Sequence, residues 1–307
     1  MRNKVNAIQT GTILLALAFL SRFIGFLREI LFANYYGIDP VMDAFVLANN
    51  IPAILLAWIF SGIVTAYTPL LSKEDEKGAE YGLLFTRKTI NILLIISVIT
   101  SLIGIFFSKP LIYIFAHGWF TGEVQTETIF YANIFVKIAF ASTLFTAFPG
   151  IWAAYLRYKK VFILPNILTE ILPKITAIAF VFISLYIGAA WIIAGTISGY
   201  ILATFVLFFF LRKKFKYKPN KVIEDDAKKD SIIKKIMLLS IPVFIGSAIQ
   251  QINSFVDTEL ATWLPSGSPA ALNYGNLMAS IGAALFSTGI LTMIYPKLAE
   301  AYAKKDK

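Results

Sequence analysis

Long apolar stretches, separated by short polar or charged segments, follow one another along the whole sequence. A helix needs about 20 mostly apolar residues to cross the hydrocarbon core of a bilayer, and eight stretches reach this length. The pattern therefore predicts an all-α integral membrane protein with about eight transmembrane helices. The expected spans are residues 7–34, 41–71, 84–107, 128–156, 162–187, 189–211, 236–263 and 269–297.

Two smaller features refine this expectation. Residues 110–119, PLIYIFAHGW, are too few to cross a bilayer, and their aromatic content favours a position at the membrane interface. In the sixth expected span, the spacing of Gly195 and Gly199 is typical of close packing against a neighbouring helix.

Lysine and arginine are concentrated in alternate connections between the expected spans. The densest group is the connection RKKFKYKPNKVIEDDAKKDSIIKK, whereas NYYGIDPVMD, TGEVQTET, YIGAAW and LPSGSPA contain no lysine or arginine. Cations accumulate in short cytoplasmic loops of membrane proteins. The alternation thus predicts a multi-pass membrane protein with both termini in the cytoplasm. It also explains the net charge of +10 without a nucleic-acid partner.

The first and seventh expected spans share a spaced pattern. Glu29 and Pro40 recur as Asp257 and Pro269, about 228 residues later. Transporters are often built from two such repeats around a central site. We therefore expect an N-terminal six-helix lobe, a basic cytoplasmic linker, and the first helical hairpin of an incomplete second lobe. These three parts are expected at residues 1–212, 213–235 and 236–307, and a second chain could complete the missing lobe.

Several charged residues fall inside the expected spans, where a charge is costly unless it faces a cavity or a partner. Arginine binds phosphate oxygens through a planar, permanently charged fork, so a cationic cavity would suit a lipid-linked phosphate. The candidate substrate-binding residues are Arg22, Arg28, Glu29, Asp43, Lys137 and Lys174.

Other arrangements of these charges remain open. Glu170 and Lys174 are spaced as a structural i,i+4 pair, and Asp43 could pair with Arg28 to hold the first hairpin. Transport could be coupled to Na⁺ or H⁺, or driven by the membrane potential acting on the cations. The candidate ion-coupling residues are Asp43, Asp257 and Glu259.

The composition argues against enzymatic, metal and cofactor chemistry. The sequence has no cysteine and one histidine, His117, which we interpret as structural. It contains no GxxxxGK[ST] phosphate loop. We find no nucleophile–base pair and no metal-ligand cluster, so we expect a protein that is not an enzyme and uses no metal or cofactor.

Three parts of the sequence resemble a known family of transporters. The similarity is to the MurJ/MviN family of lipid II flippases. It is carried by SRFIGFLREILFANYYG followed by MDAFVLANNIP, by residues 251–278 and by the motif YPKLAE. That family belongs to the multidrug/oligosaccharidyl-lipid/polysaccharide exporter superfamily. The resemblance extends over essentially the whole chain, and implies a fold like the N-terminal lobe of that family plus the first two helices of its second lobe.

The resemblance also implies a function. It implies movement of the undecaprenyl-pyrophosphate-linked peptidoglycan precursor across the bacterial inner membrane by alternating access, with Arg22, Arg28 and Asp43 in the cavity-lining hairpin. The chain departs from the family pattern at a few positions. Leu56, Ser61, Thr258 and Asn276 stand where the family usually has charged residues. Two alternatives therefore stay open: an O-antigen or capsule-type lipid-oligosaccharide exporter, and a non-transporting truncated membrane subunit.

Overall fold

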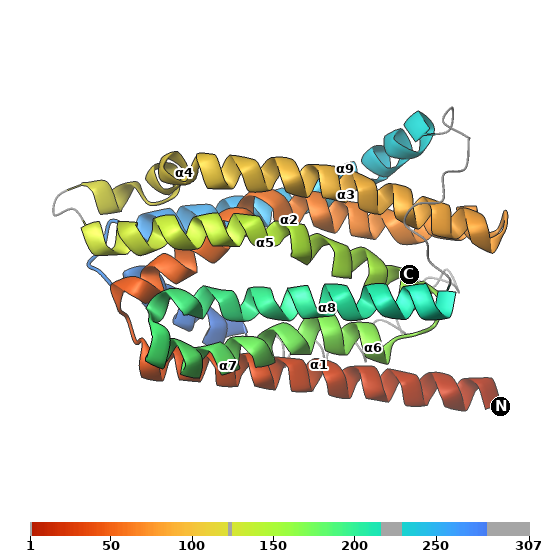
Figure 1. The fold of residues 1–307 in the computed structure, drawn as a ribbon, viewed down its shortest axis with the longest axis horizontal. Helices are drawn as coiled ribbons and strands as arrows, with labels where there is room; N and C mark the ends of the chain where they lie inside the picture. Colours follow the sequence, from red (N-terminus) through yellow and green to blue (C-terminus); the bar gives the residue numbers. More distant parts are fainter. Residues whose placement is uncertain (1, 122–124, 216–228, 281–307) are drawn as a thin grey trace, which may run out of the picture.

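The computed structural model describes residues 2–121, 125–215 and 229–280 of the chain. Every regular element in these residues is a helix (Figure 1). The elements are α1 (Arg2–Tyr35), α2 (Pro40–Asp75), α3 (Ala79–Phe106), α4 (Ser108–Phe115), the 3₁₀ turn η1 (His117–Phe120), α5 (Thr126–Tyr158), α6 (Ile163–Asn166), the π-helix η2 (Ile167–Ile171), α7 (Leu172–Ile187), the 3₁₀ turn η3 (Ala189–Trp191), α8 (Ile192–Phe215) and α9 (Lys229–Ala261). A last helix begins at residue 268 and is described as far as residue 280.

The structure confirms an all-helical membrane fold and several of the expected spans. Four helical segments are long and apolar enough to cross a membrane: residues 79–106, 126–158, 163–187 and 189–215. Helix α2 makes a fifth if its two bent halves form one span. Helices α1 and α9 are 34 and 33 residues long and cover the first and seventh expected spans, but they are less apolar. The count of eight stays a prediction, because residues 281–297 of the last expected span and most of the expected linker lie outside the described residues.

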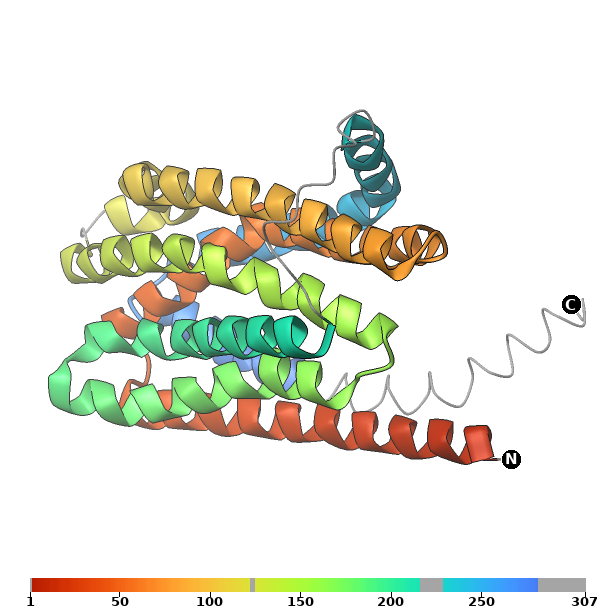
Figure 2. The same cartoon turned by 45° about the vertical axis from the view of Figure 1, so that its right-hand side comes forward.

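The helices form a bundle with α2 and α5 at its centre. Helix α2 packs against α5, α9 and α3, while α5 also packs against α3 and α8. Helix α7 pairs with α8, and α1 lies along α7 at the edge of the bundle in both views (Figures 1 and 2). The connections α1–α2 and α7–α8 and the connection that follows α9 gather at one end, at the left of Figure 1. We call this the hairpin end. These three connections, none of which contains lysine or arginine, therefore share one end of the bundle.

Aromatic side chains fill the two cores of the bundle. In the core nearer the hairpin end, the rings of Phe32 and Phe45 meet edge to face at 5.2 Å. In the other core, the rings of Tyr67 and Phe85 stack at 5.6 Å. Large apolar side chains also cover the outside, and Phe106 is 76% exposed. An apolar exterior around an apolar core is expected of helices that are buried in lipid on their outer faces.

Charged side chains fasten the bundle at the end opposite the hairpin end. The Lys159 ammonium lies 2.6 and 2.8 Å from the two carboxylate oxygens of Asp75, and the Tyr158 hydroxyl donates to the same carboxylate at 3.2 Å. Asp75 is the last residue of α2, and Lys159 follows directly after α5. Because both groups are largely shielded from solvent, this contact ties the ends of the two central helices together.

Two helices depart from regular geometry next to the interior of the bundle. Helix α2 contains Pro52 and Pro69 and bends by 48° between Leu56 and Ile59. A proline removes a backbone hydrogen bond and favours such a kink. The π-helix η2 introduces one wide turn before α7, and π-turns of this kind are frequent at functional sites.

The expected close packing at Gly195 and Gly199 is confirmed. A Cβ atom on Gly195 would lie 2.7 Å from Cβ of Phe180 and 2.8 Å from Cα of Ala177. A Cβ atom on Gly199 would collide with the backbone of Pro173. The two glycines therefore allow α8 to approach α7 more closely than any larger residue would.

We expect Gly195→Ala to destabilise the protein by about 1–3 kcal/mol, because the added methyl group must push α7 and α8 apart. The shift in thermal unfolding midpoint of the detergent-purified chain measures this effect. Gly11→Ala is the matched control, since a Cβ atom there meets nothing within 4 Å. Equal midpoints for the two variants would show that the α7–α8 contact tolerates the extra volume.

Candidate functional site

Helix α1 carries an ion pair inside its apolar sequence. The Arg28 guanidinium contacts Oε1 of Glu29, with Nε at 3.0 Å, and lies 5.4 Å from the centre of the Phe32 ring. The Arg28 side chain is 25% exposed, whereas that of Glu29 is 5% exposed. Oε2 of Glu29 is buried and has no hydrogen-bond partner among the described residues. The pair therefore lowers the cost of burying Glu29 and leaves part of the guanidinium accessible.

A second cation joins α1 to α7. Nζ of Lys174 donates to Oγ of Ser21 at 2.5 Å and to its backbone oxygen at 3.2 Å, and Oγ of Ser21 donates to the backbone oxygen of Glu170 at 3.2 Å. The expected side-chain pair between Glu170 and Lys174 is thus replaced by a link to Ser21. The physical reason is the π-helix, since its wider turn disturbs the i,i+4 spacing and frees a backbone carbonyl.

The structure brings three of the predicted cations together. Lys174 lies within electrostatic reach of Arg22, Arg28 and Glu170. Arg22 itself is exposed on α1. We call Arg22, Arg28 and Lys174 the cation group. Lys137, the remaining cation among the candidates, is on α5, which packs against α2, α3 and α8 rather than beside α1.

Asp43 has a different environment from the cation group. Its side chain is fully buried, and its two carboxylate oxygens accept hydrogen bonds from the backbone N–H groups of Gly267 at 2.6 Å and Ala270 at 2.9 Å. Gly267 directly precedes the last helix and Ala270 lies in its first turn, and the helix dipole favours an anion at this end. The expected pairing of Asp43 with Arg28 is therefore wrong, because Arg28 pairs with Glu29 and Asp43 binds backbone groups of the second hairpin.

Further contacts hold the two hairpins together near Asp43. The N–H of Gly118 donates to Oγ1 of Thr262 at 3.2 Å, and the Tyr274 hydroxyl donates to the backbone oxygen of Gly37 at 3.0 Å. The His117 ring lies 5.5 Å from the Trp263 ring, in agreement with a structural role for this histidine. Together with Asp43, these contacts close the hairpin end, and we call them the hairpin-end closure.

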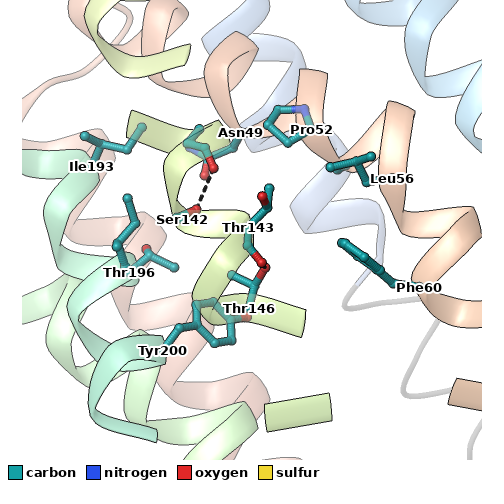
Figure 3. Close-up of a pocket in the computed structure, with 13 residues that line it drawn as sticks. Asn49, Pro52, Leu56, Phe60, Ser142, Thr143, Thr146, Ile193, Thr196 and Tyr200 are labelled. Carbon is teal, nitrogen blue, oxygen red and sulfur yellow. Dashed lines mark hydrogen bonds between the residues drawn. The ribbon is translucent and has the colours of Figure 1, made fainter. Parts of the chain in front are cut away.

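A cavity of about 390 Å³ lies between α2, α5 and α8 (Figure 3). Its walls include polar side chains from all three helices and apolar side chains such as Leu56, Phe60 and Ile193. No charged residue lines it. Tyr200, in its wall, follows Gly199, which packs against Pro173 of α7, so this wall lies beside the helix that carries Lys174. The polar lining residues are Asn49, Ser142, Thr143, Thr146, Thr196 and Tyr200.

A second pocket of about 380 Å³ lies between α2, α9 and the last helix. It is lined by several amides and by Asp257, whose Oδ2 accepts from Nδ2 of Asn253 at 3.4 Å. Glu259 lies elsewhere and accepts from Nε1 of Trp263 at 2.8 Å. The three candidate ion-coupling carboxylates, Asp43, Asp257 and Glu259, therefore have separate partners. Within the described residues there is no cluster of three or more His, Asp or Glu side chains that could hold a metal.

Sequence reasoning missed the role of Ser21 and the cavity between α2, α5 and α8. The positions of Ser142, Thr143 and Thr146 carried a usable signal, because hydroxyls at this spacing share one face of a helix. Ser21 offered no comparable signal, since its partner is created by the π-helix.

Comparison with known proteins agrees with this architecture. The family model described as lipid II flippase MurJ matches residues 32–307. A protein of Vibrio cholerae named "Probable lipid II flippase MurJ" is 26% identical over 303 residues, which cover 96% of this chain and 57% of the relative. A protein of the same name in Aquifex aeolicus is 27% identical over 292 residues, covering 94% of this chain and 55% of the relative.

A solved structure titled "Lipid II flippase MurJ, inward closed conformation" has a similar fold. Its TM-score is 0.74 at 23% sequence identity, over 95% of this chain and 59% of that chain. This chain thus spans a little under three-fifths of the length of the relatives that it matches. Since the family model covers most of the sequence, the chain belongs to the lipid II flippase MurJ family.

Proposed function

We propose that this protein moves a lipid-linked pyrophosphate saccharide, the peptidoglycan precursor lipid II, across the bacterial inner membrane by alternating access. The observation that carries the proposal is the cation group on α1 and α7 in a chain of the MurJ family. The proposal concerns a transporter rather than an enzyme, and both termini are placed in the cytoplasm. The relatives are longer than this chain, so the second lobe would be completed by further helices, either of the same polypeptide or of a second chain.

The cation group suits a diphosphate. Arg28 is only partly covered by Glu29, and Lys174 and Arg22 lie close enough to add positive charge. A pyrophosphate that approaches these groups would form charge-assisted hydrogen bonds with the guanidinium. Because Glu29 and Ser21 already stabilise two of the cations, the site can stay folded when the cargo leaves.

The hairpin-end closure supports alternating access. The loops at this end carry no lysine or arginine, which supports an outer position for them in our proposal. Asp43 joins the first hairpin to the start of the last helix across this end. A transporter that receives cargo from the cytoplasm must be closed on the outer side while it does so. We therefore assign the described arrangement to an inward-facing state.

The departures from the family pattern define the second candidate, an O-antigen or capsule-type exporter. Leu56 and Thr258 carry no charge, so neither position supplies a cation to a cargo. In our proposal, Lys174 compensates for the positive charge that the family usually has at these positions. The two candidates differ in the lipid that the protein binds.

We expect Arg28→Ala to lower the retention of lipid II by the purified chain at least about tenfold, because charge-assisted hydrogen bonds to the phosphate are lost. Native mass spectrometry of the protein with added lipid II measures the bound fraction. The same substitution is expected to abolish rescue of a flippase-depleted bacterium at normal expression.

Two variants make this test specific. Arg28→Ala combined with Glu29→Ala removes the buried carboxylate as well, so a loss of lipid in this variant does not reflect an unpaired charge. Arg212→Ala, in the last turn of α8, is the matched control outside the cation group. Undiminished lipid II binding by the Arg22→Ala, Arg28→Ala double variant would refute the proposal, and a different co-purifying lipid-linked oligosaccharide would favour the second candidate.

We expect Asp43→Asn to open the hairpin end. An amide cannot accept hydrogen bonds at both of its positions, so the contact with Gly267 or Ala270 is lost. The chain has no cysteine, and Ala270→Cys therefore provides one label site. We expect this cysteine to react about tenfold faster with a membrane-impermeant maleimide in the Asp43→Asn background. Asp39→Asn is the control, because Asp39 is exposed and makes no side-chain cap hydrogen bond. Equal labelling rates in the two backgrounds would contradict a gating contact at Asp43.

The proposed orientation predicts the sidedness of two further positions. In spheroplasts, a cysteine at Tyr186, which lies in the last turn of α7 and is 89% exposed, should react with an impermeant maleimide. A cysteine at Lys77, between α2 and α3, should react only after the membrane is permeabilised. The reverse result would place the lysine-free loops in the cytoplasm and overturn the assignment.

A further inference from the structure

We infer that the cavity between α2, α5 and α8 binds a neutral sugar ring of the cargo. This inference rests on the proposed function for the identity of the sugar, and it concerns a site inside the first six-helix lobe rather than between the two hairpins. The cavity has a volume of about 390 Å³, and Asn49 in its wall is exposed. Figure 3 shows the polar side chains of α5 and α8 facing the apolar side chains of α2 across this space.

The hydrogen-bonding groups of the wall are divided between donors and acceptors. Ser142 donates to the backbone oxygen of Ala139 at 2.6 Å, and Thr143 donates to that of Phe140 at 2.8 Å. Thr146 donates to the backbone oxygen of Thr143 at 3.4 Å. The hydroxyl hydrogens of these three residues are thus directed to the helix, and their oxygen lone pairs remain as acceptors.

Helix α8 and Asn49 of α2 supply donors. The structure shows no hydrogen-bond partner within the described residues for the hydroxyls of Thr196 and Tyr200. Asn49 donates one N–H to the backbone oxygen of Phe45 at 2.8 Å, which leaves its second N–H and its oxygen. A ligand with hydroxyl and amide groups on its rim can therefore both donate and accept here.

Within the described residues, the absence of charged residues and the presence of free hydroxyls in the wall disfavour ions, phosphates and lipid chains as ligands. Because no charged residue lines the cavity, a phosphate or a free ion would lose its hydration without a counter-charge. A lipid chain would bury the hydroxyls of Thr196 and Tyr200 without partners. Phe60, Leu56 and Ile193 offer an apolar surface to the C–H face of a sugar ring. A hydroxylated ring with apolar faces satisfies both kinds of wall.

The position of the cavity fits the covalent structure of the cargo. In a lipid-linked pyrophosphate saccharide the first sugar is bonded directly to the diphosphate. A site for that sugar must therefore lie next to the cations that hold the phosphates. Gly199, which precedes Tyr200, packs directly against Pro173, which precedes Lys174, so this wall of the cavity lies beside the segment that carries one of the cations.

The test uses the full chain in lipid nanodiscs and free N-acetylglucosamine as the probe. Saturation-transfer-difference NMR reports which sugar protons contact the protein, and a titration gives the dissociation constant. Thr196→Val and Tyr200→Phe each remove a hydroxyl with little change of shape. We expect each to weaken binding about three- to tenfold and the double variant to abolish it.

Two control variants match these changes outside the cavity. Thr100→Val removes a hydroxyl on α3 that donates to Ile96, and Tyr186→Phe removes one from an exposed ring. Both should bind the sugar like the wild type, and all variants should unfold at similar temperatures. The inference is overturned if the folded wild-type chain shows no saturable sugar contact, or if the double variant binds like the controls.

The outcome is separable from that of the proposed function. Free N-acetylglucosamine carries no phosphate, so its binding does not depend on the cation group. If Arg28→Ala abolishes lipid II binding while the wild type does not bind the free sugar, this inference alone fails. If the sugar binds in the cavity while lipid II retention is independent of Arg22 and Arg28, the assignment of the phosphate site fails instead.

Discussion

The cost of placing a charge among apolar helices governs the arrangement of the interior. A buried carboxylate or ammonium is tolerated when it is paired or fully hydrogen-bonded. The structure meets this condition with short-range partners. Glu29 pairs with the adjacent Arg28, Lys174 binds Ser21, and Asp43 binds two backbone N–H groups. The contacts of Lys174 and Asp43 also join distant parts of the chain, and the contact with Glu29 leaves part of the Arg28 guanidinium accessible. The charges that stabilise the fold are therefore the ones that a translocation site can use.

The positions of the helices could be predicted from the sequence to a large extent, because hydrophobic length reports directly on membrane-spanning segments. The gathering of the lysine-free loops at one end of the bundle agrees with the charge alternation. The close approach of α7 and α8 followed from the spacing of Gly195 and Gly199. These features are local, because each depends on residues within one apolar stretch or one connection.

The pairing of charges was harder to predict, because it depends on contacts between distant segments. Asp43 finds its partners 224 and 227 residues away, and those partners are backbone N–H groups that no sequence pattern marks. Glu170 and Lys174 have the spacing of an ion pair, yet the π-helix directs Lys174 to Ser21 on another helix. The cavity was not predicted because its wall also depends on contacts between distant segments. Three helices form the wall, and no charged residue lines it.

The bend of α2 connects these sites. The cavity is lined on both sides of the bend, by Asn49, Pro52 and Leu56 before it and by Phe60 after it. Asp43, near the start of the same helix, takes part in the hairpin-end closure. A change in the bend would alter the width of the cavity and the position of Asp43 together. A proline-containing helix that has already lost a backbone hydrogen bond can bend at a lower cost than a regular one. Helix α2 is therefore the element through which occupancy of the cavity could act on the closure, because it is the helix common to both.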